Sequence, residues 1–140
     1  MKNLTHSIFI FLLALSFSCG PSPSEKNQQL RDEVIAVHDE VMPLMGKLKS
    51  LEKEAASAAE ELEASGSEDT TRIEELKALA FDLNQAYEGM FVWMRQYETE
   101  DGELTPEEVK AYLDDQMSKV SVVNEDIKAA LEKAEELLKD

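Results

Sequence analysis

The chain has 140 residues, the size of one domain, and 43% of them are hydrophobic. Acidic residues outnumber basic ones by 30 to 14, and the formal net charge is -16. A surface this negative repels phosphate backbones, which argues against nucleic acid as a partner and leaves a cationic metal or a basic protein surface allowed.

Residues 1–18 are expected to be a signal peptide. Lys2 gives the start a positive charge, and an apolar run from Ile8 to Phe17 follows. The run is shorter than the ~20 residues that a membrane-spanning helix needs. The pattern therefore predicts export and removal of this segment.

Cys19, the only cysteine, follows the apolar run. A single cysteine cannot form an intrachain disulfide, so anchoring through its sulfur is favoured, with an incidental cysteine after an ordinary signal peptide as the alternative. Residues 15–19, Leu-Ser-Phe-Ser-Cys, resemble bacterial lipoprotein signals, with Leu15 one position earlier than in the common form. The resemblance implies cleavage before Cys19 and a diacylglyceryl lipid, with acyl chains such as palmitate, that anchors the protein to a membrane.

Residues 19–24 are expected to be the lipidated cysteine and a short tether. Pro and Ser resist helix formation, and five residues reach at most ~17 Å, so the folded domain should stand close to the membrane. No Asp follows Cys19. By the enterobacterial sorting pattern, the resemblance implies an exported protein anchored in the outer membrane of the cell envelope.

Three runs of apolar residues, spaced alternately by three and four positions, fill the rest of the chain. This coiled-coil spacing predicts helices at about 25–64, 68–98 and 106–139. Short connections make neighbouring helices antiparallel, so residues 25–140 are expected to form an all-α, antiparallel three-helix bundle. The seam of the second helix is expected at Ile73, Leu76, Ala80, Leu83, Tyr87, Met90, Met94 and Tyr97.

Local signals mark the helix ends and one interruption. Gly66, between the first two helices, can take the left-handed conformation that ends a helix. Thr105, Pro106 and Glu108 predict a capping box with proline at the first helical position. Pro43 lies inside the first helix, where its missing N–H predicts a bend.

One part of the first helix is chemically unusual, because it holds the only histidine after the leader together with two methionines. Their spacing places all three on one side of the helix. Antiparallel pairing brings two methionines and a tryptophan of the second helix to the same level. This His/Met cluster consists of His38, Met42, Met45, Met90 and Met94, with Trp93 adjacent.

Two interpretations of the His/Met cluster stay open. In the first it is core packing without a cofactor, since methionine fills uneven gaps in cores. In the second it is a Cu(I) site, because thioether sulfur and imidazole nitrogen suit this ion and Trp93 could lie against a bound cation. The set of one histidine, two methionines and a nearby tryptophan resembles the sites of small periplasmic copper chaperones, although those proteins are β-barrels.

No catalytic residues are expected. The chain after Cys19 has one histidine and no glycine-rich phosphate loop, and its paired carboxylates fall on solvated helix faces. Residues 101–108 resemble the second half of a calcium-binding EF-hand loop, but Tyr97 and Thr99 stand where its first carboxylates belong. An acidic turn with a helix cap is the favoured interpretation, and weak calcium binding is the alternative.

Two motifs, His-Asp-Glu-Val-Met-Pro-Leu-Met-Gly at 38–46 and Trp-Met-Arg at 93–95, resemble those of small uncharacterised lipoproteins from Gram-negative bacteria. Members are often labelled viral A-type inclusion protein, a label that reflects coiled-coil character rather than an activity. The likeness spans the mature chain and implies a helical fold and an envelope location. The sequence therefore predicts a lipid-anchored protein with a structural or protein-binding role, with a periplasmic Cu(I)-binding protein as the alternative.

Overall fold

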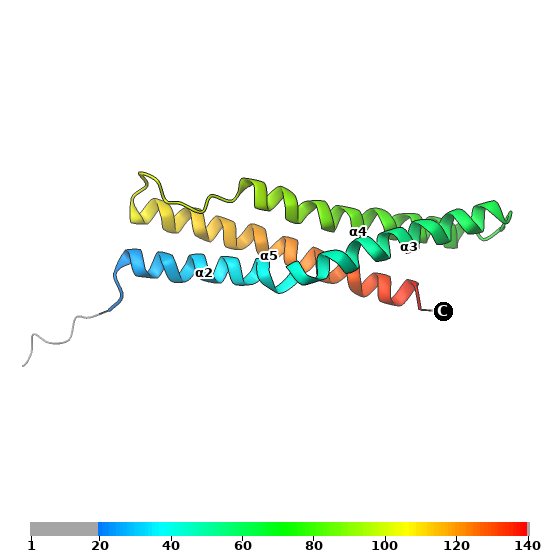
Figure 1. Ribbon diagram of the computed structural model, residues 1–140, viewed down its shortest axis with the longest axis horizontal. Helices are drawn as coiled ribbons and strands as arrows, with labels where there is room; N and C mark the ends of the chain where they lie inside the picture. The colour runs from blue at the N-terminus through cyan, green and yellow to red at the C-terminus, as the bar shows by residue number, and fades with distance from the viewer. Residues whose placement is uncertain (1–19, 140) are drawn as a thin grey trace, which may run out of the picture.

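The computed structural model describes residues 20–139, in which three long helices pack antiparallel in an all-α fold (Figure 1). The first helix is divided into α2 (Pro23–Val41), a short 3-10 turn η2 (Met42–Leu44) and α3 (Met45–Ala64). The second is α4 (Thr70–Gln96), and the third is α5 (Pro106–Leu137). The expected all-α fold with antiparallel helices is confirmed.

The first helix begins two residues earlier than expected, so that Pro23 and Ser24 belong to α2 rather than to the tether. The hydroxyl of Ser22 accepts a hydrogen bond from the N–H of Glu25 at 3.2 Å, and the Glu25 carboxylate accepts one from the N–H of Ser22 at 2.7 Å. This capping box satisfies backbone donors at the helix end and lowers the pKa of Glu25. The expected signal peptide and Cys19 lie outside the described residues.

Pro43 interrupts the first helix at the predicted place. Because proline has no N–H, the carbonyl of Asp39 loses its usual backbone donor, and the chain tightens into η2. The interruption also changes the neighbour of the helix. Before it, α2 packs against α5, and after it, α3 packs against α4 (Figure 1). One long helix can therefore cover both members of the α4–α5 pair.

The two connections between the long helices have the glycine and capping features that the sequence predicts. Gly66 has a φ of 71° and Gly102 a φ of 58°, left-handed conformations that cost glycine little because it has no Cβ. The hydroxyl of Thr105 accepts from the N–H of Glu108 at 3.3 Å, and the Glu108 carboxylate accepts from the N–H of Thr105 at 2.8 Å. The predicted capping box at the start of α5 is confirmed.

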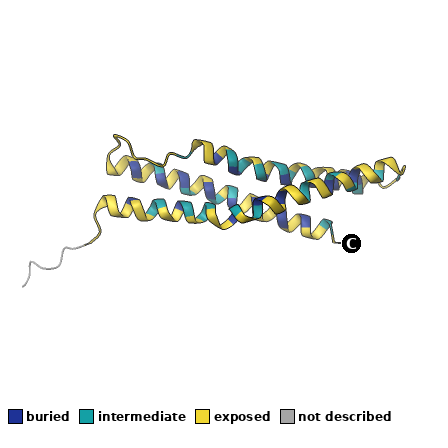
Figure 2. Cartoon of the chain, in the orientation of Figure 1, coloured by how far each residue is buried: buried dark blue, intermediate teal, exposed yellow. Residues whose placement is uncertain are grey.

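Buried residues recur along all three long helices (Figure 2). On α4, however, the expected seam was wrong at three positions. The buried residues are each one position earlier: Leu79, Ala86 and Trp93. Of the expected residues, Ala80 and Tyr87 are half-buried and Met94 is exposed. Since α4 touches both α3 and α5, neighbouring positions compete for the interior. Leu79 and Trp93 take it because burying them removes more apolar surface from water than burying Ala80 or Met94.

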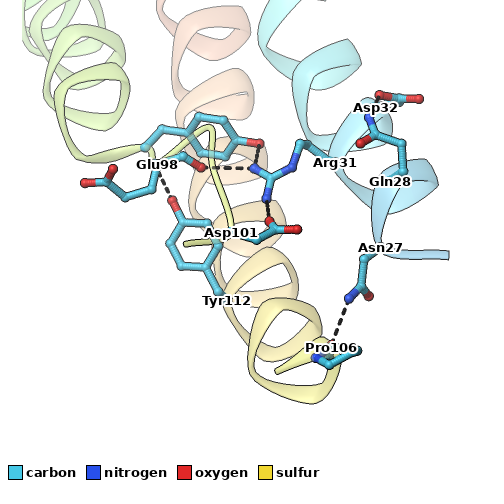
Figure 3. A network of polar contacts seen from close by, with 9 residues as sticks. Asn27, Gln28, Arg31, Asp32, Glu98, Asp101, Pro106 and Tyr112 are labelled. Carbon is cyan, nitrogen blue, oxygen red and sulfur yellow. Dashed lines mark hydrogen bonds and ion pairs between the residues drawn. The ribbon is translucent and has the colours of Figure 1, made fainter. Parts of the chain in front are cut away.

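The end of the bundle at the α4–α5 loop is closed by Arg31 of α2 (Figure 3). Its guanidinium donates to the hydroxyl of Tyr97 at 3.2 Å, to the carbonyl of Glu98 at 3.0 Å and to the carboxylate of Asp101. The N–H of Glu98 in turn donates to the hydroxyl of Tyr112 at 2.5 Å. One cation thus ties the acidic loop, including its Asp101 carboxylate, to the first helix.

Candidate functional site

His38 lies in the last turn of α2, with 14% of its side chain exposed. Its Nδ1 atom lies 2.8 Å from Oδ1 of Asp39. Because an ionised carboxylate only accepts hydrogen bonds, a neutral imidazole in this contact carries its proton on Nδ1. Nε2 then keeps its lone pair, and this buried atom has no hydrogen-bond partner in the described part of the chain. A carboxylate that orients an imidazole in this way is the usual outer partner of a metal-binding histidine.

Aromatic rings continue from His38 toward the loop end of the bundle. The ring centroid of His38 is 5.5 Å from that of Trp93, and Trp93 is 4.9 Å from Tyr97. Tyr97 is in turn 6.2 Å from Tyr112 on α5. Trp93 is 5% exposed, and its buried Nε1 has no partner within residues 20–139. Within the described residues, His38 and the adjacent Trp93 therefore hold two buried nitrogen atoms without hydrogen-bond partners.

The structure gathers most but not all of the predicted cluster. Met45 and Met90 are buried in the same core as Trp93, and Met42 packs against that core from its edge. Met94 is 39% exposed and lies outside this set. Of the predicted sulfur donors, those of Met42, Met45 and Met90 therefore belong to the core that contains Trp93 or pack against it.

Sequence reasoning missed a polar contact that braces this segment. Asn124 of α5, 5% exposed, donates its amide to the carbonyl of Val37 at 2.9 Å and to the carboxylate of Glu40 at 3.0 Å. Lys128 donates to the other oxygen of Glu40 at 2.7 Å. The hydrogen bond from Lys128, followed by that from Asn124, holds the pKa of Glu40 below its usual value. The available signal was an asparagine within an apolar run, directly after Val122 and Val123.

Two shallow hollows, of about 540 Å³ and about 360 Å³, follow one another along the junction of α4 and α5. We call this surface the α4–α5 groove. Its walls are formed on α4 by Phe81, Asp82, Gln85, Ala86, Gly89, Val92, Trp93 and Gln96, and on α5 by Ser118, Lys119, Val122, Val123, Asp126, Ala129, Ala130 and Lys133. Sequence reasoning missed it, because heptad spacing describes the buried faces and not the outer junction of two helices.

No protein-family model, curated protein or solved structure matches the chain. The geometry of the site is therefore the basis for any functional proposal. Among the helices of the described residues, none is long and apolar enough to cross a membrane.

Proposed function

We propose that the chain is a lipid-anchored protein of the cell envelope that acts by binding another protein, without catalysis. The observation that carries this proposal is a row of exposed apolar side chains along the α4–α5 groove. Phe81 exposes 61% of its surface, Val122 56% and Val92 43%, on a chain with a net charge of -16. Apolar side chains gathered on a charged surface mark interaction sites, because a partner that covers them removes them from water.

Site-specific photo-crosslinking in cells tests the binding role. A photoreactive phenylalanine analogue is placed at Val92, at Val122 and, on the exposed surface of α3, at Glu54. We expect adducts with one defined envelope protein. If no position on any helix face gives a protein adduct, the binding role is wrong.

The proposed anchor is the lipid on Cys19. It is supported by the apolar leader, the lone cysteine and the resemblance of residues 15–19 to lipoprotein signals. The residue after Cys19 is not Asp, which by the enterobacterial sorting pattern favours the outer membrane. Cys19→Ser should abolish metabolic labelling by a fatty-acid probe and release the chain from the membrane fraction, because no other cysteine can carry the lipid. Equal labelling of the wild type and the variant would rule out this anchor.

Binding of Cu(I) in the envelope is a second candidate function, and one observation favours it. The Nε2 atom of His38 is buried, keeps its lone pair and has no partner in residues 20–139. With the sulfur atoms of Met42, Met45 and Met90 it would supply imidazole and thioether ligands, which are the types that Cu(I) prefers.

We expect His38→Gln, Met42→Leu and Met90→Leu each to weaken Cu(I) binding by about tenfold or more if this candidate is right, because each removes one ligand atom. Met-to-Leu changes nearly conserve volume, so the metal-free fold should lose less than about 1.5 kcal/mol. Met94→Leu is the matched control, since Met94 lies outside the buried set. Competition with a mild Cu(I) chelator under reducing conditions measures the affinity, and a wild-type chain that takes no Cu(I) removes the candidate.

A further inference from the structure

The α4–α5 groove is long enough to hold a helix. Its wall on α4 passes through Phe81, Gln85, Gly89, Val92 and Gln96, which follow one another by three or four positions along one side of the helix. At 1.5 Å per residue this wall is ~22 Å long, about four helical turns. The groove therefore matches a helix laid along it better than a compact ligand.

Small residues stand beside the buried Trp93 and the half-buried Val123 among the residues that line the groove. A Cβ atom added at Gly89 would meet nothing within 4 Å, and Ala86 and Ala129 line the same surface. Small residues let the side chains of an approaching helix reach the floor. The backbones of α4 and α5 satisfy their own hydrogen bonds, so they offer no edge to an extended peptide, whereas a helical partner brings its backbone already paired.

The α5 edge of the groove is acidic. Its two lysines already have carboxylate partners, because Lys133 pairs with Asp82 and Lys119 with Asp115 at 2.6 and 2.7 Å. Exposed Glu125 and Glu132 lie three positions beyond Val122 and Ala129, on the α5 edge of the groove. Neither glutamate is in an ion pair in the described part of the chain.

We propose that the α4–α5 groove binds an amphipathic helix whose apolar stripe covers Val92, Val122 and Phe81 and whose flank toward α5 carries lysine or arginine. The inference rests on the proposed protein-binding role and names the partner's chemistry. A second copy of this chain fits poorly, since each copy carries a net charge of -16 and the acidic edges would face each other.

Two synthetic helices of about five turns test the proposal. They share one leucine stripe, and one carries lysine at its flanks where the other carries glutamate. Fluorescence anisotropy measures their binding to the full chain in nanodiscs of zwitterionic lipid, with empty nanodiscs as the blank. We expect the lysine-flanked helix to bind about tenfold or more tightly than the glutamate-flanked one.

Charge reversal on the groove edge gives the decisive comparison. Glu125→Lys with Glu132→Lys should invert the preference between the two helices. The matched control is Glu54→Lys with Glu61→Lys on α3, which has the same spacing and the same change in net charge but lies on an exposed surface away from the groove. If the control pair shifts the preference as far as the groove pair, binding follows net charge and the proposal fails.

The apolar contact has its own control. Val122→Asn should weaken binding of the lysine-flanked helix by about tenfold. Leu104→Asn, at a residue of similar exposure in the α4–α5 loop, should leave that binding unchanged. A dimer in sedimentation that Val122→Asn disrupts, with no helix bound, would assign the groove to a second copy instead. Crosslinks from Glu54 alone, with neither helix bound, would overturn the groove proposal and leave the general binding role standing.

Discussion

Replacing Leu83 with alanine is expected to lower the free energy of unfolding by about 2–5 kcal/mol. Leu83 is completely buried in the shared core, on the middle helix α4, which packs against both α3 and α5. The shortened side chain leaves a cavity that two neighbouring helices would have to close together. Urea denaturation of residues 20–140, followed by circular dichroism, measures the change.

Phe81→Ala is the control for this prediction. It lies two positions away on the same helix and removes a larger side chain, but Phe81 is 61% exposed. Phe81→Ala should therefore change the free energy of unfolding by no more than about 0.5 kcal/mol. If Leu83→Ala costs no more than Phe81→Ala, the three-helix packing is contradicted.

Helix positions could be predicted because the signals are local. The capping box at Thr105, the glycine at Gly66 and the proline at Pro43 each act on the backbone within a few residues, and each does so in the structure. The same kind of local signal explains why α2 begins two residues earlier than expected. Ser22 and Glu25 form a capping box that the sequence also contains, although Pro and Ser in this stretch had suggested a tether.

The phase of burial was harder to predict, because it depends on where the neighbouring helices lie. In the second part of the first helix, Met45 and Ala59 are buried, whereas Leu44 and Ala58, one position earlier, are half-buried. On α4 the interior lies between two neighbours, and a single seam does not describe it. Heptad spacing therefore identified the core helices and misplaced some of the residues that fill the core.

Contacts between distant segments could not be read from the sequence. Pairing of the first two helices placed His38 near Trp93, and the rings do lie together. Three features depend on side-chain directions across three helices: the Nε2 of His38, which has no partner within residues 20–139, the Asn124 contacts and the charge on the groove edge. These are the features on which the functional proposals rest.

Trp93→Ala is expected to lower the free energy of unfolding by about 3–5 kcal/mol. Trp93 is 5% exposed and packs against the rings of His38 and Tyr97. Trp93→Phe should cost no more than about 2 kcal/mol. Phenylalanine keeps an aromatic ring at the site, and the indole Nε1 that it removes has no partner in residues 20–139.

The comparison of the two variants separates ring packing from hydrogen bonding. Urea denaturation measures both losses of stability, and near-ultraviolet circular dichroism reports whether the tyrosines as a group keep a fixed environment. If Trp93→Phe destabilised the chain as much as Trp93→Ala, the N–H rather than the ring would be holding the segment. An acceptor for Nε1 would then have to come from outside residues 20–139, because the described bundle supplies none.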